Sequence, residues 1–284
     1  MSTFAPDLLA GKIAYVAGGT RGMNLAIAKR YAQYGANVCV ISRSPERCAA
    51  AQAELEAFGV KALGIPCDVR DYDLVAETMA RASEELGGGI DIVVAGQAGN
   101  FYAPVTGMSA KGFRTIVDID LVGTFHVFKA SWDHLRRPGA SLVAITAPEA
   151  VRPLHFQAHV CAAKAGVNML IRVFALEWGP EGVRVNGISP GPIEGSWGMS
   201  NVASPSPQIV EMIRRAVPLK RWGKESDVAD TALFLASDAA SYISGSIIET
   251  DGGVTIASPE SSHFNSVEDL HNDPRVRRPR PKKD

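Results

Sequence analysis

The sequence predicts an α/β fold made of one doubly wound domain, in which a seven-stranded parallel sheet carries helices on both faces. Two patterns support this fold class. Short apolar runs alternate with longer helical patterns, and the short runs are apolar throughout rather than at every second residue. Strands of that kind are buried on both faces, as in a parallel sheet that is covered by helices.

The seven expected strands are short and apolar, and a helical pattern follows most of them. They cover residues 12–19, 36–42, 60–69, 89–96, 140–146, 183–191 and 246–253. The expected helices cover residues 21–34, 45–58, 71–87, 109–135, 157–179 and 225–237. Right-handed crossover connections between such strands place a ligand crevice at the carboxyl ends of the strands.

Residues 1–257 are expected to form this single domain, and two segments depart from its alternating pattern. Residues 194–215 begin with a stretch rich in Gly, Ser, Asn and Pro and end in a short helical pattern. A connection of that length is typical of a lid over a crevice. Residues 258–284 are polar, basic and rich in proline, which indicates a flexible tail.

Composition and charge exclude several classes of protein. The 29 Lys and Arg residues nearly balance the 30 Asp and Glu residues, so no nucleic-acid partner is expected. No apolar run approaches the roughly 18 to 20 residues of a membrane span, and the N-terminus lacks a secretory pattern. The four cysteines show no metal spacing, and the C-terminus is not a peroxisomal SKL-type address. We therefore expect no metal site and a cytoplasmic protein with reduced thiols.

A glycine-rich turn, "VAGGTRGMN" (16–24), follows the first strand and opens the first helix, which makes the predicted domain Rossmann-type. Its glycines permit a tight turn and close backbone approach to a ligand. The N-terminus of the helix offers free N–H groups and partial positive charge to a pyrophosphate. The candidate ligand contacts in this turn are Gly18, Thr20, Arg21 and Gly22.

The end of the second strand, "ISRS" (41–44), predicts which dinucleotide binds. An acidic residue there would hold a ribose hydroxyl, but this chain has Ser42, Arg43 and Ser44, which suit a 2′-phosphate. Arg21 can add a second cation. The sequence therefore favours NADPH over NADH. Further candidate contacts at later strand ends are Asp68 with Val69, for the adenine side, and Gly96.

The stretch "AHVCAAKAG" (158–166) places Lys164 on an amphipathic helix after the fifth strand. The side chain that faces the same way one turn earlier belongs to Val160, which can neither give nor take a proton. The residues alone leave open whether Lys164 lies on the surface, belongs to an inactive site or serves a chemistry without an acid at Val160.

Over residues 8–255 the chain resembles the short-chain dehydrogenase/reductase family, through "AGGTRGMN", "SR", "CDV", "DIVVAGQAGNF", "PGPI" and "DGG". The resemblance implies that Pro190, Gly191 and the backbone of Ile193 meet the nicotinamide carboxamide. It also implies an oligomer, usually a tetramer, with the helices at 109–135 and 157–179 in an interface.

The chain departs from the family pattern at its centre. The family's catalytic Tyr is Val160 here, its active-site Ser is Ala147, and its usual Asn on the fourth helix is Asp120. The third glycine of the nucleotide turn is Asn24. Carbonyl reduction needs an acid to protonate the alkoxide that hydride transfer leaves, and Val160 cannot supply that proton.

One branch of the family, the 2,4-dienoyl-CoA reductases of the peroxisomal type, is similar in "AGNF", "DIDLVGTF", "ALEWGPEGVRVN" and the spacing from His159 to Lys164. The resemblance implies NADPH-dependent reduction of a conjugated 2,4-dienoyl-CoA or related enoyl thioester. It gives catalytic roles to Lys164, Asp120 and Asp251, and Lys164 also binds the nicotinamide ribose. It places Asn100 and Phe101 in the acyl pocket.

Such chemistry does not require the missing tyrosine. A conjugated dienoyl thioester accepts hydride at the far end of the diene, and the charge spreads to the thioester oxygen as an extended enolate. Carbon is finally protonated. Lys164 adds positive charge, and Asp120 can donate a proton or orient a water if its surroundings raise its pKa.

Two other residues and two other functions remain open. Glu149 is either an exposed acid or a carboxylate at the acyl pocket, and His159 is either packed or a substrate contact. The protein could instead be a ketoreductase or 3-hydroxyacyl dehydrogenase with a non-standard acid. It could also be an inactive family member that acts as a partner subunit, as Asn24, Ala147 and Val160 allow.

Overall fold

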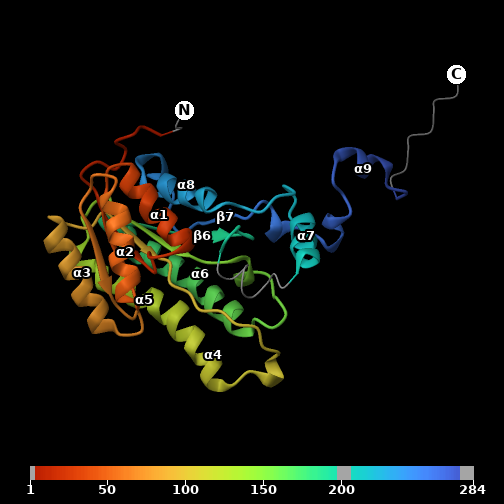
Figure 1. Ribbon diagram of the computed structural model, residues 1–284, viewed down its shortest axis with the longest axis horizontal. Coiled ribbons are helices and arrows are strands. Elements are labelled where there is room, and N and C mark those ends of the chain that lie inside the picture. Colours follow the sequence, from red (N-terminus) through yellow and green to blue (C-terminus); the bar gives the residue numbers. More distant parts are fainter. Residues whose placement is uncertain (1–3, 197–205, 276–284) are drawn as a thin grey trace.

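The computed structural model describes residues 4–196 and 206–275 (Figure 1). Within these residues seven strands form one parallel sheet in the order β3-β2-β1-β4-β5-β6-β7, as the sequence predicts. The strands are β1 (Ile13–Ala17), β2 (Asn37–Ser42), β3 (Ala62–Pro66), β4 (Ile92–Ala95), β5 (Ser141–Ile145), β6 (Arg184–Pro190) and β7 (Ile247–Thr250).

The strand order reverses beside β1, and this reversal positions the site. The chain moves outward through β2 and β3, then returns to pair β4 with the other side of β1. Ala17 at the end of β1 lies level with Ile41 of β2 and Ala95 of β4. The turns that leave β1, β2 and β4 therefore meet at one edge of the sheet, where doubly wound folds bind ligands.

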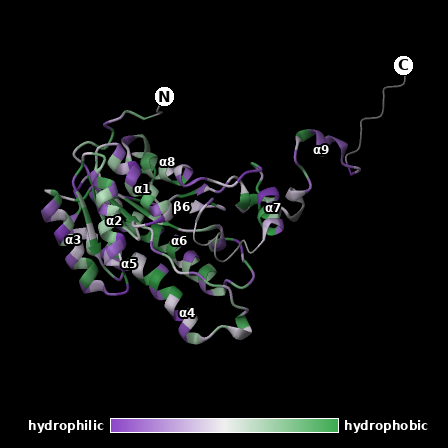
Figure 2. Ribbon diagram, in the orientation of Figure 1, coloured by the Kyte–Doolittle hydropathy of each residue, from purple (hydrophilic) through white to green (hydrophobic). Residues whose placement is uncertain are grey.

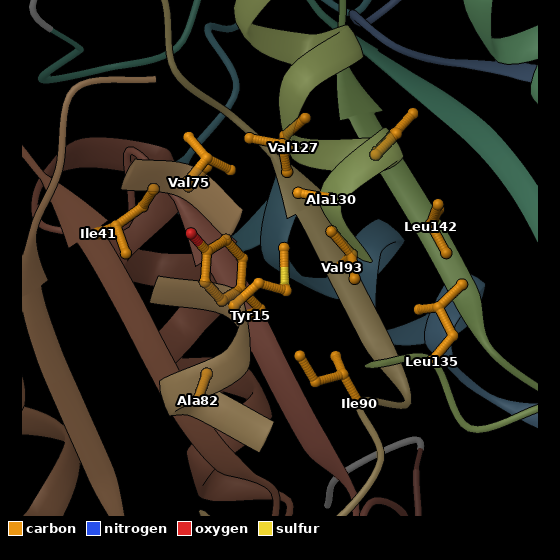
Figure 3. Packing of buried hydrophobic residues seen from close by; sticks show 14 of the residues in the cluster. Tyr15, Ile41, Val75, Ala82, Ile90, Val93, Val127, Ala130, Leu135 and Leu142 are labelled. Atoms are coloured by element: carbon orange, nitrogen blue, oxygen red, sulfur yellow. The ribbon is translucent and has the colours of Figure 1, made fainter. Parts of the chain in front are cut away.

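Helices cover both faces because the strands are apolar on both sides. One core packs β1, β2 and β4 against α1 (Gly22–Gln33), α2 (Pro45–Glu56) and α8 (Glu225–Ala236). The other core packs the sheet against α3 (Tyr72–Leu86), α5 (Gly123–Ser131) and α6 (Ala158–Trp178). Figure 3 shows this second core, in which Tyr15 and Val93 of the sheet face Val75 of α3 and Val127 of α5.

The prediction of a single helix over 109–135 is wrong. The segment consists of α4 (Ala110–Val117), a π-helical turn η2 (Asp118–Val122), α5 and the 3-10 turn η3 (Trp132–His134). Gly123 follows the π turn, and a Cβ there would lie 2.8 Å from Val69 Cγ2. Asp120 lies within this turn and is fully buried. Single π turns of this kind frequently mark functional sites.

The segments after β6 differ in part from the sequence prediction. The predicted lid contains α7 (Pro207–Ala216), and its residues 197–205 lie outside the described part of the chain. Residues predicted as a flexible tail form the short helices η9 (Pro259–Ser262) and α9 (Val267–Asn272). Lys220 Nζ donates to the carbonyl oxygen of Ser261 at 2.7 Å, so part of this segment is fixed near α7 (Figure 1). Residues 276–284 lie outside the description.

Among the described helices, α6 alone is apolar and long enough to cross a membrane by length and composition, over Ala158–Glu181. In this fold α6 lies on the sheet, and 44% of its apolar window is buried. Figure 2 shows hydrophobic residues concentrated in the sheet and on helices beside it. The outer face of α6 nevertheless exposes Met169, Val173 and Leu176.

Candidate active site

A cleft of about 610 Å³ opens where the carboxyl ends of the central strands meet. Turns after β1, β2, β3, β4, β5 and β6 line it, together with η2 and the first turns of α6. The cleft brings together most of the residues predicted to contact the cofactor: Gly18, Thr20, Arg21, Gly22, Ser42, Arg43, Asp68, Val69, Gly96, Lys164, Pro190 and Gly191.

The glycine-rich turn after β1 leaves the N-terminus of α1 open to the cleft. Gly18 has a positive φ of 71°, and a Cβ there would lie 2.9 Å from the Cα of Gln97, so a larger residue does not fit. No side chain caps α1, which begins at Gly22. The first N–H groups of α1 are therefore available to an anion, and the helix dipole favours one.

Three arginines border the cleft at the end of β2. Arg21, Arg43 and Arg47 all line it, and burial followed by the positive charges of Arg47 and Arg43 lowers the pKa of Arg21. Within residues 4–196 and 206–275, the side chains of Arg43 and Arg47 make no ion pair. Arg47 was not predicted as a phosphate contact. Its position in the first turn of the helix after "ISRS" could have indicated that role. The cluster is a strong site for a phosphate.

Ser44 takes a different role from the one predicted. Its hydroxyl caps α2 by accepting from the N–H of Arg47 at 3.3 Å, and it donates to Glu46 at 2.7 Å. Ser44 does not line the cleft. Its hydroxyl already has two partners, so Ser42 and the arginines remain as the phosphate contacts at this strand end.

The adenine side of the predicted site is bounded by Asp68 and Val69 after β3. Arg70 donates to the carboxylate of Asp68 at 2.5 and 3.1 Å, and these bonds hold the pKa of Asp68 below its usual value. Across the turn, Asn24 Nδ2 donates to the carbonyl of Gly96 at 2.5 Å. Asn24 thus fixes the turns after β1 and β4 to each other, in the place of the family's third glycine.

Asp120 and Lys164 form the charged centre of the cleft. Asp120 is fully buried, and its Oδ1 accepts from the N–H of Gly99 at 2.7 Å. Lys164 Nζ lies 3.3 Å from Asp120 Oδ2 and donates to the carbonyl of Ile145 at 2.9 Å. The Nζ–Oδ2 contact is an ion pair without hydrogen-bond alignment, so Oδ2 lacks a hydrogen bond. The π turn η2 and helix α6 position the two groups.

Burial raises the pKa of Asp120 above its usual value, and this effect outweighs the lowering by Lys164 and by the N–H of Gly99. A raised pKa makes the protonated acid more abundant near neutral pH than it is for a solvated aspartate. This upward shift is what a proton donor requires, and the catalytic role of Asp120 stays a prediction.

The walls beside this pair are apolar at two decisive positions. Val160, on α6, is 6% exposed and lines the cleft, as does Ala147 after β5. Neither side chain can give a proton or a hydrogen bond. The structure thus brings the valine predicted from "AHVCAAKAG" into the same cleft as Lys164.

The predicted substrate residues divide into two pairs. Asn100 and Glu149 line the cleft, and the buried Oδ1 of Asn100 has no hydrogen-bond partner within the described chain. Phe101 and His159 do not line it. Their rings stack on each other with centroids 4.2 Å apart, and burial lowers the pKa of His159. Both ring nitrogens of His159 are buried without a hydrogen-bond partner within the described residues, and its contact with substrate stays a prediction.

Asp251 does not line the cleft, and its catalytic role stays a prediction. Its Oδ1 accepts from the N–H of Gly253 at 2.8 Å, and its Oδ2 accepts from the N–H of Thr255 at 2.6 Å. It packs on the cofactor turn, because a Cβ at Gly191 would lie 2.7 Å from its Cα. We therefore expect Asp251 to hold the turn at Pro190 and Gly191 in place.

Ile193 also lies beside the cleft rather than on its wall. Its side chain is 1% exposed and contacts Gly223, where a Cβ would lie 2.6 Å from Ile193 Cδ1. A contact through its backbone stays a prediction. Cleft residues that sequence reasoning missed include Arg47, Gln97, Thr146 and Gln157. The side-chain directions of the last three depend on tertiary packing, which no local pattern encodes.

Known proteins resemble this chain over most of its length. A family model described as enoyl-(acyl carrier protein) reductase matches residues 17–255. The peroxisomal 2,4-dienoyl-CoA reductase ((3E)-enoyl-CoA-producing) of Arabidopsis thaliana is 35% identical over 279 residues, 95% of this chain and 93% of that protein. The protein of the same name from Rattus norvegicus is 36% identical over 258 residues, 90% and 88% of the two chains.

The fold also matches solved structures. The citronellol catabolism dehydrogenase of Pseudomonas aeruginosa is 31% identical and superimposes with a TM-score of 0.78. The match covers 89% of this chain and 99% of that one.

Proposed function

Because the chain belongs to the short-chain dehydrogenase/reductase family, we propose that it reduces a conjugated 2,4-dienoyl-CoA, or a related enoyl thioester, with NADPH. Family membership makes it an oxidoreductase with a nicotinamide cofactor. The observation that carries the proposal is the buried Asp120–Lys164 pair in a cleft that has Val160 and Ala147 in place of the usual acid and hydroxyl. Relatives named 2,4-dienoyl-CoA reductases support it.

The residues of the cleft fit NADPH. The uncapped N-terminus of α1 and the close turn at Gly18 suit a pyrophosphate. Arg43 and Arg47 suit the 2′-phosphate that distinguishes NADPH from NADH, and β2 ends in Ser42, where an acidic residue would instead hold a ribose hydroxyl. Lys164, which lines the cleft beside Ile145, would bind the nicotinamide ribose. When bound, NADPH supplies the hydride.

The reaction that this site supports is reduction across a conjugated system. Hydride adds to the δ-carbon of the dienoyl chain, the γ–δ double bond breaks, and the electron pair moves through the chain to the thioester oxygen. A proton then bonds to the α-carbon, which leaves a 3-enoyl thioester and oxidised cofactor. The relatives named (3E)-enoyl-CoA-producing support this position for the product double bond.

The Asp120–Lys164 pair can meet two requirements of that reaction, stabilisation of the enolate charge and delivery of a proton. Lys164 places positive charge beside the enolate, and the low dielectric of the cleft strengthens the effect. Asp120, with its raised pKa, delivers a proton to the α-carbon directly or through one water and recovers it from solvent. Because the final proton bonds to carbon, no tyrosine is needed to protonate an alkoxide.

The proposal is tested with the purified full-length chain, NADPH and three acyl-CoA classes: 2,4-dienoyl, 2-enoyl and 3-ketoacyl. We expect NADPH oxidation with the dienoyl ester and identification of the 3-enoyl product by NMR. Faster turnover of the 3-ketoacyl ester would instead support the ketoreductase hypothesis. Loss of that activity in Glu149→Ala would then identify Glu149, a carboxylate that lines the cleft, as the acid.

Assembly and location belong to the same proposal. The outer faces of α4, α5 and α6 expose Phe113, Phe125, Met169, Val173 and Leu176. Apolar side chains in such a set are typical of an interface. We propose a homotetramer that buries these helices, which light scattering of the purified protein tests. We also propose a cytoplasmic location, which imaging of a tagged chain tests against the peroxisomal location named for relatives.

A further inference from the structure

In the proposed reaction the thioester oxygen becomes the enolate oxygen, and it has the positive charge of Lys164 nearby but no hydrogen-bond donor assigned to it. Ala147 and Val160 occupy the places of the two hydroxyl donors that an ordinary family member presents. Lys164 Nζ already donates to Ile145 and faces Asp120, and its third donor is needed for the ribose. An enolate oxygen in a buried cleft requires a further hydrogen-bond donor.

Gln157 meets this requirement. Its side chain is 3% exposed and lines the cleft on the same side as Val160. Within the described residues, neither its amide nitrogen nor its amide oxygen has a hydrogen-bond partner. The amide atoms are therefore open to the cleft, where a ligand can reach them. The amide group of Gln157 offers two N–H donors.

The backbone around Gln157 is fixed on both sides. Phe156 has a φ of 68°, which is unfavourable for an aromatic residue, and its carbonyl accepts from the N–H of Ala103 at 3.1 Å. The N–H of Gln157 donates to Leu154 at 3.3 Å, and its carbonyl accepts from Cys161 at 2.9 Å. Strained residues of this kind persist where the surrounding structure holds them, commonly beside functional groups. Phe156 directly precedes Gln157, which lines the cleft.

Gln157 lies beside the partial positive charge of a helix N-terminus, which favours a negative oxygen there. It directly precedes α6, whose N-terminus has no side-chain cap. The unpaired N–H groups of the first turn give this end of the helix partial positive charge. A negative oxygen held by the Gln157 amide therefore lies at the positive end of α6, with Lys164 further along the same helix.

We propose that Gln157 is a catalytic residue of this enzyme, whose side-chain N–H binds the thioester oxygen and stabilises the extended enolate. This inference rests on the proposed function. In this role the Gln157 amide, at the start of α6, takes the place of the two missing hydroxyl donors. It also predicts that substrates need a carbonyl conjugated to the diene, since an isolated diene offers the amide no oxygen.

The test compares Gln157→Leu and the isosteric Gln157→Glu with the wild-type chain on a 2,4-dienoyl-CoA. We expect kcat to fall about 10²- to 10³-fold for Leu and further for Glu, because a carboxylate repels the enolate. The KM for NADPH stays unchanged. Gln33→Glu, at an exposed position on α1, is the matched control and keeps wild-type kcat.

A spectroscopic measurement separates carbonyl binding from a structural role. In the complex with NADP⁺ and dienoyl-CoA, the absorption band of the dienoyl group shifts to longer wavelength when a donor polarises the carbonyl. We expect that shift in the wild-type chain and its loss in both variants. A folded Gln157→Leu or Gln157→Glu chain that keeps the shift, with kcat within about threefold of wild type, overturns the inference.

The outcomes also separate this inference from the function on which it rests. Wild-type chain that does not oxidise NADPH with any dienoyl-CoA overturns both. Wild-type activity that survives loss of the Gln157 amide overturns only the role of Gln157. If Gln157→Leu does not fold, Gln157→Glu decides, since it has the same size and shape.

Discussion

Asp120 and Asp251 are both buried carboxylates near the carboxyl ends of the strands, and they differ in what their oxygens contact. Asp120 gives one oxygen to the N–H of Gly99 and presents the other to Lys164 without a hydrogen bond. Both oxygens of Asp251 accept hydrogen bonds, from backbone N–H groups two and four residues later in its own turn. The first carboxylate faces the cleft, and the second closes a loop.

The difference shows that burial alone does not identify a catalytic acid. A carboxylate whose oxygens both accept backbone hydrogen bonds stabilises a turn, and protonation would break one of those bonds. A carboxylate with an unpaired oxygen beside a lysine can exchange a proton without that loss. From this comparison we expect proton transfer from Asp120 and positioning of the turn at Gly191 by Asp251.

The largest expected effect follows from Asp120→Asn. Asparagine keeps an oxygen for the N–H of Gly99, so the fold should persist, but it cannot donate a proton as an acid does. We expect kcat for dienoyl-CoA reduction to fall about 10³-fold. Stopped-flow or steady-state NADPH oxidation measures the loss, and Asp118→Asn on the same π turn is the control. Equal losses in both variants would argue for damage to η2 instead.

A smaller effect is expected at the arginine cluster. Arg43→Ala and Arg47→Ala should each raise the KM for NADPH by about 10- to 100-fold, because each removes a charge-assisted bond to the 2′-phosphate. The KM for NADH, which lacks this phosphate, should stay within a factor of about two and serves as the internal control. An equal rise in the KM for NADPH and for NADH would show that the arginines do not contact the 2′-phosphate.

The smallest effect on turnover is expected from Asp251→Asn. Asparagine has one side-chain oxygen, so one of the two turn bonds is lost at a cost of about 1 to 3 kcal/mol. Thermal unfolding should shift down by several degrees, while kcat changes less than about tenfold. A thousandfold loss of kcat at an unchanged melting temperature would give Asp251 the catalytic role that the sequence resemblance implies.

The sheet could be predicted because each strand is a continuous apolar run, and those runs bury both faces. The cofactor turn could be predicted because Gly18 and Arg43 each come directly after an apolar strand, where the local sequence pattern is enough to locate them. The π turn at η2 could not, since one extra residue hardly changes a helical hydrophobic pattern. The partners of Asp251 and the direction of Gln157 depend on tertiary contacts that spacing does not encode.

The central claim, that Asp120 supplies the proton, is tested most directly by the pH dependence of kcat at saturating NADPH and dienoyl-CoA. A proton donor works in its acid form, so kcat should be level below the pKa of Asp120 and fall about tenfold per pH unit above it. Because burial raises that pKa, the fall should begin at higher pH than for a solvated aspartate. The account predicts this limb in the wild-type chain and its absence in Asp120→Asn. The same limb in both chains would contradict it.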